Sequence, residues 1–167
     1  RHRRLVGSEM CIRDSFSTLH TNDAPSAVTR MVDMGVPGYL VASSVIAILA
    51  QRLVRTVCSK CKTKVTPRES VILESGLTLE QAKNANFVRG KGCNHCQKTG
   101  YKGRLGIFEL MLINSKIREM IFADSSSTQL RDAAISQGMM TLYSDGLDKV
   151  MRGLSLIHIS EPTRRLC

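Results

Sequence analysis

The chain has 167 residues, of which 43% are hydrophobic, and it carries a formal net charge of +10 from 24 Lys+Arg against 14 Asp+Glu. This length suits one domain of modest size or two small ones. The longest apolar stretch, residues 39–50, is too short to span a bilayer. The sequence therefore argues against a transmembrane segment and favours a buried core element at this position.

The two ends of the chain, residues 4–15 (RLVGSEMCIRDS) and 154–165 (LSLIHISEPTRR), are related through their DNA. One back-translation of the first string has a reverse complement that, read one base along, encodes the second string without a mismatch. Strand propensity cannot explain reverse complementarity. Both strings resemble the transposon-end adapter used to tag sequencing libraries. We therefore expect residues 1–15 and 154–167 to be adapter read-through that packs poorly and is not part of the native fold.

The first half of the remaining chain predicts three elements. Residues 16–20 (FSTLH) are typical of a strand end that runs into a helix capped by Asn22 or Asp23. Gly35 ends this helix, and residues 39–57 predict a longer helix that is apolar nearly all round and therefore buried.

The second half of the remaining chain contains several helix-start signals, which predict short helices. The pattern predicts an α+β fold that is mostly helical, in three parts: residues 16–57, a cysteine region at 58–103, and a strand with C-terminal helices at 104–153. The expected elements are helices after the capping boxes Thr66–Glu69 and Thr78–Gln81, a strand over 104–113, a helix capped by Ser115, a helix capped by Ser127 or Thr128, and a last helix from about Thr141.

Four cysteines lie between the two end segments, as two C-x-x-C pairs: Cys58 with Cys61, and Cys93 with Cys96. Two such turns can supply four thiolates to a tetrahedral Zn²⁺, and a fully occupied Cys₄ site has a structural role. The pattern favours metal binding in a reducing compartment over a disulfide scaffold. Iron–sulfur ligation, a redox dithiol and replacement of one cysteine by His95 are the alternatives.

The cysteine region carries the excess positive charge, because residues 52–104 hold 12 basic and 3 acidic residues, a net charge of +9. Clustered Lys and Arg are the electrostatic signature of phosphate binding. The region has only two aromatic residues, Phe87 and Tyr101, and so offers no stacking platform for bases. Nucleic acid is therefore not the partner we expect.

Three segments carry a family resemblance: STLHTNDAPSAVTRMVDMGV, LVASSVIAILAQRLVRTVCSKCK and GCNHCQKTGYKGRLGIFELM. In this order they resemble the secretion ATPase family, the hexameric P-loop motors that drive type II secretion and type IV pilus assembly. The resemblance covers essentially all of residues 16–153. It implies the C-terminal fragment of a RecA-like P-loop ATPase domain with an inserted Cys₄ zinc subdomain. It also implies a cytoplasmic protein, peripheral to the bacterial inner membrane.

The resemblance implies roles for single residues. STLHTND matches the family's histidine box, which places His20 near the nucleotide; the alternative is a capping histidine at a strand end. Arg52 and Arg55 match the helix that leads into the zinc subdomain, where they could contact nucleotide phosphate or a neighbouring subunit, although surface arginines facing a helix dipole are at least equally expected there. The four cysteines match a tetracysteine insertion, which is a candidate for docking to the inner-membrane platform protein.

The phosphate-binding motif G-x-x-x-x-G-K-[ST] does not occur in the sequence. We therefore expect no ATP hydrolysis by this fragment, whereas the complete parent would be a homo-hexamer that uses ATP and Mg²⁺. Type II secretion and pilus assembly are not separated by these residues. The alternative function is a free-standing basic zinc ribbon that binds nucleic acid or a protein. For a fragment, we also expect exposed apolar surface at Val28, Met31 and residues 39–50.

Overall fold

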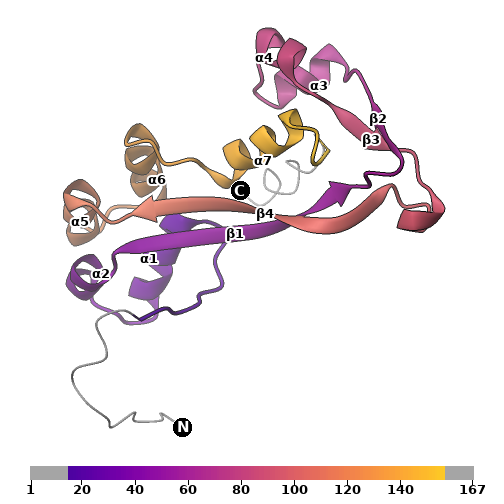
Figure 1. Ribbon diagram of the computed structural model, residues 1–167. Coiled ribbons are helices and arrows are strands. Elements are labelled where there is room, and N and C mark those ends of the chain that lie inside the picture. The colour runs from indigo at the N-terminus through magenta and orange to yellow at the C-terminus, as the bar shows by residue number, and fades with distance from the viewer. Residues whose placement is uncertain (1–14, 157–167) are drawn as a thin grey trace.

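The computed structural model of the protein describes residues 15–156, which combine helices with two separate two-stranded antiparallel sheets (Figure 1). None of the helices in this range is both long enough and apolar enough to cross a bilayer. In chain order the elements are α1 (Ala24–Asp33), α2 (Gly38–Ser44), β1 (Ala47–Val57), β2 (Lys62–Lys64), α3 (Glu69–Glu74), α4 (Leu79–Asn84), β3 (Val88–Gly90), η1 (Asn94–Cys96), β4 (Tyr101–Leu112), α5 (Ser115–Phe122), α6 (Ser127–Ser136) and α7 (Leu142–Met151).

The long β1–β4 ribbon is the backbone of the fold. Its register runs from Ala47 opposite Leu112 to Val57 opposite Tyr101, with an irregularity between Arg55 and Val57. Helices α2 and α5 lie at one end of the ribbon, and β2, β3, α3 and α4 lie at the other (Figure 1). The ribbon therefore connects two separately packed regions.

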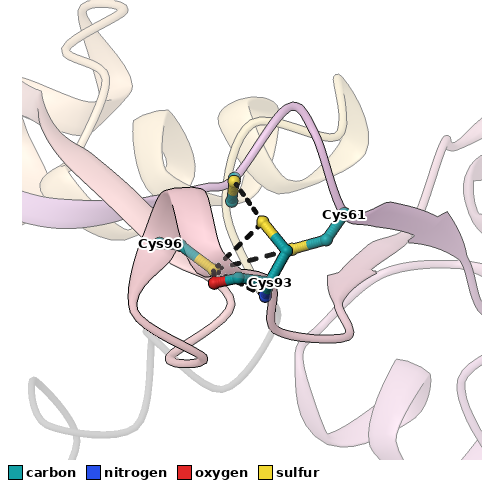
Figure 2. A group of neighbouring side chains, drawn as sticks. Cys61, Cys93 and Cys96 are labelled. Carbon is teal, nitrogen blue, oxygen red and sulfur yellow. Dashed lines mark hydrogen bonds between the residues drawn. The ribbon is translucent and has the colours of Figure 1, made fainter.

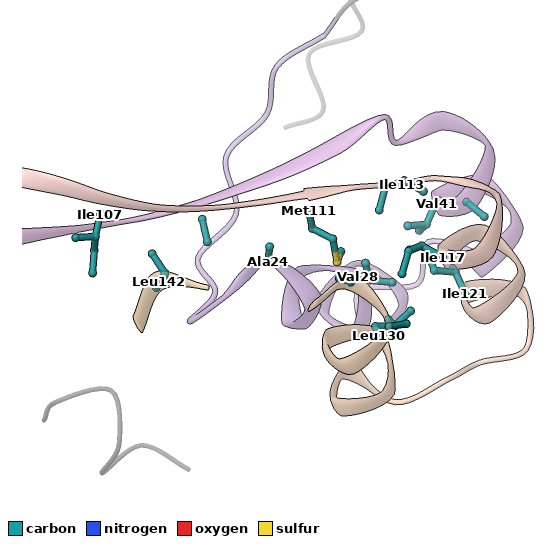
Figure 3. Close-up of a cluster of buried hydrophobic side chains, with 14 of the residues drawn as sticks. Ala24, Val28, Val41, Ile107, Met111, Ile113, Ile117, Ile121, Leu130 and Leu142 are labelled. Atoms are coloured by element: carbon teal, nitrogen blue, oxygen red, sulfur yellow. The ribbon is translucent and has the colours of Figure 1, made fainter. Parts of the chain in front are cut away.

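The main hydrophobic core lies on one face of the ribbon. Because side chains alternate along a strand, Ala50, Val54, Ile107 and Met111 all point to this face and are buried. Figure 3 shows Met111 pointing towards Val28 of α1, and Ile107 lying beside Leu142 of α7. The rest of this core comes from Ile113, just after β4, and from the helices: Ala24, Val28, Val41, Ala42, Ile117, Ile121, Leu130, Ala133, Ala134 and Leu142.

A second, smaller core joins the cysteine region to the C-terminal helix. It contains Ile72, Leu77 and Phe87 from the cysteine region together with Leu147 and Val150 from α7. Backbone contacts reinforce the packing, since the Asn86 N–H donates to Met151 O at 2.7 Å. The Tyr143 hydroxyl donates to Ser75 O at 2.9 Å. The α3–α4 segment is thus held against α7 as well as by its own turns.

Glu109 in β4 is a carboxylate buried between two helix N-termini, with 3% of the residue exposed. Its Oε1 accepts a hydrogen bond from the Ala24 N–H at 2.8 Å, and its Oε2 accepts one from the Leu142 N–H at 3.1 Å. Ala24 and Leu142 are the first residues of α1 and α7. The unpaired amides and the positive end of each helix dipole stabilise the buried anion.

The predicted helix over residues 39–57 is wrong. Helix α2 ends at Ser44, and Ala47–Val57 forms the strand β1. Good helix formers such as Ala, Leu, Gln and Arg made this stretch look helical, but its partner strand β4 lies some fifty residues further on. Cross-strand pairing and burial of every second side chain override the local preference.

Several smaller expectations also need correction. Residues 16–20 form no strand, and Val28 is buried at 3% exposure instead of lying on an open surface. Met31 likewise packs against the main core. The predicted N-caps Asp23 and Thr78 are confirmed, whereas the side chain of Thr66 caps no helix. The N-caps of α5 and α6 are Asn114 and Ser126, each one residue before the serine that was expected to cap the helix.

Two residues of the expected C-terminal adapter segment form hydrogen bonds with the end of β1, and one of them is buried. The Val57 N–H donates to Leu154 O at 3.0 Å, and the Ser155 hydroxyl, on a residue only 2% exposed, donates to Arg55 O at 2.9 Å. Gly153 has φ +68°, which ends α7 and turns the chain onto the edge of β1. Poor packing is therefore the wrong expectation for Ser155, whereas the Leu154 residue is 38% exposed and takes part through its backbone. Residues 1–14 and 157–167 lie outside the described range, and the boundary itself stays a prediction.

We expect Glu109→Gln to destabilise the protein by about 1–3 kcal/mol, because one of the two helix amides would then face an NH₂ group in a buried position. The exposed residue Glu119 on α5 provides a control, since Glu119→Gln should change the free energy of unfolding by less than about 0.5 kcal/mol. Denaturant unfolding followed by circular dichroism measures both. Equal effects of the two substitutions would contradict the role of Glu109.

Candidate metal centre

The four predicted cysteines come together at the end of the β1–β4 ribbon. Cys58 follows β1 directly and Cys61 precedes β2, while Cys93 is the N-cap of the single turn η1 and Cys96 is its last residue. All four sulfur atoms lie within 4.8 Å of one another, and all four thiols are free (Figure 2).

The spacing of the sulfur atoms fits a tetrahedral zinc site. The Sγ–Sγ distances are 3.9 Å for Cys58 and Cys93, 3.8 Å for Cys61 and Cys96, and 3.7 Å for Cys93 and Cys96. A regular tetrahedron with Zn–S bonds of ~2.3 Å places its sulfurs about 3.8 Å apart. A disulfide would need its two sulfurs about 2.05 Å apart. The donor set and the spacing therefore suit a metal ion held by four thiolates.

The turns that present the cysteines depend on two glycines. The Cys58 N–H donates to Gly100 O at 3.0 Å, which closes the ribbon beside the cluster. A Cβ on Gly90 would lie 2.1 Å from Gly100 O, and a Cβ on Gly100 would lie 2.7 Å from Gly90 O. Gly100 also has φ +80°, a conformation that other residues rarely adopt. The two backbones can approach this closely only because neither residue has a side chain.

Backbone amides and burial give the thiols different acidities. The N–H groups of Cys93 and Gly100 donate to Cys96 Sγ at 3.1 and 3.3 Å. These hydrogen bonds, that from Cys93 first, lower the pKa of the Cys96 thiol to about 6. Burial raises the pKa of the Cys61 thiol to about 12. Like charges this close disfavour one another, so a bound cation would favour the ionised form of the thiols that hold it.

His95 does not belong to the cluster. It lies on the exposed side of η1, with its Nδ1 3.3 Å from the Lys102 Nζ. Desolvation, followed by the positive charges of Lys102 and Lys60, lowers the pKa of His95 below its ordinary value. Among the residues described, the group that can hold a metal consists of the four cysteines. The alternative in which His95 replaces a cysteine therefore has no geometric support.

The other predicted site residues lie elsewhere. His20 is exposed and lies in the irregular segment before α1. The Arg52 guanidinium donates to Asn22 Oδ1 at 2.8 Å, and Asp23 both caps α1 and forms an ion pair with Arg131 of α6. Arg52 therefore faces the segment that carries His20, and this segment is fixed by side chains from β1 and α6.

Arg55 points away from His20, on the opposite face of β1 from Arg52. Its guanidinium lies over the Tyr101 ring, 4.4 Å from the centroid. The expected placement of Arg52 and Arg55 at the negative end of a helix is wrong, because both residues belong to β1.

Two sets of residues at these sites were not predicted: Glu109, and the glycine pair of the metal centre. A signal for Glu109 was present, since it is the one acidic residue in the apolar strand IFELML. A charged residue in such a strand needs specific partners. The pairing of Gly90 with Gly100 left no comparable signal, because a glycine count does not show which backbones approach one another.

Comparison with known proteins assigns the chain to a family. Residues 10–161 match the family model of type II/IV secretion system proteins. Because the match covers most of the sequence, the chain belongs to this family of secretion-system proteins, and the predicted family membership is confirmed.

The curated relatives come from both branches of the family. The chain is 41% identical over 142 residues to the type IV pilus assembly ATPase PilB of Thermus thermophilus, covering 85% of this chain and 16% of that protein. It is 42% identical over 150 residues to type II secretion system protein E of Aeromonas hydrophila, covering 89% of this chain and 29% of that protein. The chain thus spans less than a third of the length of these relatives.

We expect the purified chain to bind a single zinc ion and Cys96→Ser to abolish this binding, because three thiolates and a hydroxyl do not replace a Cys₄ set. Zinc content by mass spectrometry and zinc-dependent thermal unfolding measure the effect. Binding at structural sites of this kind contributes an apparent ~10–16 kcal/mol, so the chelated protein should unfold at a markedly lower temperature. Ser59→Ala, in the exposed turn between two ligands, is the control. Full zinc content in Cys96→Ser would contradict a Cys₄ site.

A glycine pair allows the close backbone approach to be tested separately from strain. Gly100→Ala and Gly103→Ala both place alanine at a left-handed φ, +80° and +86°, but only Gly100 has backbone within 3 Å of the new Cβ. We expect Gly100→Ala to weaken zinc affinity by at least about tenfold, as supporting contacts of metal ligands do. Gly103→Ala should reduce stability by about 1–2 kcal/mol and leave zinc affinity unchanged. Competition with a chromogenic chelator measures the affinity.

Proposed function

We propose that this chain is the C-terminal part of an ATPase that powers type II protein secretion or type IV pilus assembly. The observation that carries the proposal is the match of one family model across residues 10–161. Relatives named as pilus assembly ATPases and as type II secretion proteins support it at similar identity. The two branches match equally well, so the proposal covers both.

In this proposal the fragment supplies a scaffold and the parent supplies hydrolysis. The sequence contains no G-x-x-x-x-G-K-[ST] loop, so the backbone N–H groups that cradle nucleotide phosphates would come from elsewhere in the parent. The fragment alone is inactive, and the RecA-like domain, the homo-hexamer and the binding of ATP with Mg²⁺ belong to the complete protein. The parent is cytoplasmic and lies against the bacterial inner membrane.

His20 is the nucleotide-proximal residue of the proposal. It is exposed, while Asn22 and Asp23 just after it are held by Arg52 and Arg131. An imidazole on a segment anchored in this way keeps its position while remaining accessible to a phosphate. Arg52 acts through Asn22, and Arg55, on the other face of β1, is the better candidate for contact with a neighbouring subunit.

Zinc has a structural role in the proposal. Cys58, Cys61, Cys93 and Cys96 would hold it as thiolates, leaving no open coordination position for substrate or water. Bound there, the ion would tie the end of the β1–β4 ribbon to the β2–β3 sheet. The region around the site would dock to the inner-membrane platform protein.

A second candidate, binding of nucleic acid by a free-standing basic zinc ribbon, is favoured only by charge. Exposed basic residues surround the centre: Lys60, Lys62, Lys64, Arg89, Lys91, Lys98, Lys102 and Arg104. Phe87 is buried, however, and the Tyr101 ring is covered by Arg55, so neither aromatic residue is free to stack on a base. A shift of labelled DNA that persists at physiological salt would favour this candidate over the motor.

The decisive measurement for the proposal is on the source DNA. Primers inside residues 16–153, extended outwards through both ends, should reveal native codons in place of the adapter-like strings and a phosphate loop upstream. In the complete protein, His20→Ala should then lower kcat by at least about tenfold while zinc content stays unchanged. Adapter-like ends that prove genomic, with no ATPase upstream, would overturn the proposal.

A further inference from the structure

The side chain of Glu109 holds the first residue of α1 and the first residue of α7 at the same time. Its Oε1 accepts from the Ala24 N–H at 2.8 Å, and its Oε2 accepts from the Leu142 N–H at 3.1 Å. Both oxygens act as acceptors, which is the pattern of an ionised carboxylate. Ala24 and Leu142 lie on the same side of the ribbon (Figure 3). The two helix starts are therefore bound to each other through Glu109, as well as to β4.

The burial of this carboxylate is compensated by amides and not by a cation. Glu109 is 3% exposed and takes part in none of the ion pairs found within residues 15–156. Burying an ionised carboxylate without compensation is costly. If one helix start moved away, the other amide would have to offset the whole cost, and water would replace both. The carboxylate therefore has two states, buried with both amides or hydrated with neither.

On the α1 side, Glu109 fixes the segment that carries His20. Besides the Ala24 amide held by Glu109, the Asp23 side chain accepts from the Ser26 N–H at 2.9 Å, and Asp23 O accepts from the Thr21 hydroxyl at 3.1 Å. His20 itself is exposed and directly precedes this fixed stretch. The direction in which its imidazole is presented therefore depends on how α1 begins.

On the other side of Glu109, α7 is held by the cysteine region. The Tyr143 hydroxyl donates to Ser75 O at 2.9 Å, and the Asn86 N–H donates to Met151 O at 2.7 Å. The C-terminal half of α7 also packs in the smaller core with side chains from the cysteine region. Because these contacts lie at both ends of the helix, a shift of the α3–α4 segment would move α7 as a unit. Such a shift would reach the amide of Leu142, the residue next to Tyr143.

We propose that Glu109 is a positioning residue that couples the His20 segment to the cysteine region through α7. With the carboxylate buried, both helix starts are held and the imidazole has one direction; with it hydrated, both are released. A shift of the α3–α4 segment against α7 biases this equilibrium, and so does a ligand held by the His20 segment. The inference rests on the proposed place of His20 near the nucleotide, and it gives that site regulation from the cysteine region.

Packing is the alternative explanation for a link between the two helices. The Leu142 side chain belongs to the main core together with Ala24 and Val28, so α7 could affect α1 without any help from Glu109. The two explanations differ in one respect. Glu109→Gln removes the shared carboxylate and leaves this packing in place, so coupling through the carboxylate disappears in that variant whereas coupling through packing remains.

The first test needs no substitution and uses the intact chain. Amide hydrogen exchange by NMR, in rising sub-denaturing guanidinium, gives the free energy and denaturant dependence of opening for each amide. We expect equal values for Ala24 and Leu142, because one carboxylate closes both. The Leu130 N–H, which donates to Ser126 O in the main core, should exchange at least about tenfold more slowly. Different values for Ala24 and Leu142, or exchange only together with Leu130, would overturn the coupling.

A double-mutant cycle then separates the carboxylate from packing. Tyr143→Phe removes the hydroxyl that bonds to the cysteine region, and it should speed exchange at both Leu142 and Ala24 by about threefold or more. In the Glu109→Gln background, the same substitution should still speed exchange at Leu142 but leave Ala24 unchanged. Tyr39→Phe, at an exposed tyrosine of α2, is the matched control and should change neither amide. Equal effects at Ala24 in both backgrounds would assign the coupling to packing and overturn the role of Glu109.

In the complete protein, a nucleotide tests the coupling from the other side. Exchange measured by mass spectrometry with a non-hydrolysable ATP analogue should slow by about threefold or more in residues 21–27 and also in 142–147, because coupling between sites is reciprocal. Glu109→Gln should abolish the slowing in 142–147 and keep that in 21–27. Slowing in 21–27 alone in the unsubstituted protein, or slowing in both segments that survives Glu109→Gln, would overturn this inference and leave the proposed function standing. Slowing in neither segment would contradict the proposed place of His20, and this inference with it.

Discussion

Glu109 lies in the middle of β4, and each of its carboxylate oxygens accepts a backbone hydrogen bond from the first residue of a different helix. Side-chain caps do not reach these amides, since Asp23 and Thr141 accept from the third residues of α1 and α7. The carboxylate completes both caps and fixes two helices to one strand. Helix α7 contributes Leu142 to the main core and Leu147 and Val150 to the smaller one, so this carboxylate ties the helix that the two cores share to α1 and β4.

The sequence predicted those features that depend on local chemistry. Asp23 and Thr78 cap helices as expected, and the C-x-x-C spacing identified the four residues that share one site. Features that depend on distant partners were missed. Residues 47–57 form a strand only because β4 lies beside them, and their alternation of inward and outward residues was hidden by alanines and leucines, which also favour helices.

The metal centre also combines features that the sequence predicts with features that depend on residues distant in the chain. Spacing alone identifies its thiols, but their acidities differ because backbone amides point at Cys96 while Cys61 is desolvated. Neither property can be read from the order of residues. The close approach of Gly90 to Gly100 is equally invisible in the sequence, although it holds the two cysteine turns together. The C-x-x-C motif therefore identifies the metal ligands, whereas the surrounding backbone determines their affinity for the metal ion.

The ribbon also separates the two candidate sites. Cys58 follows the last residue of β1 and Gly100 precedes the first of β4, so the metal centre closes one end of the ribbon at the pair Val57–Tyr101. The His20 segment is held further along, through Arg52 and Glu109. Several paired rows lie between, each with its own cross-strand contacts. Loss of the metal should therefore loosen the ribbon end and the β2–β3 sheet first, while the rows that hold α1 remain paired.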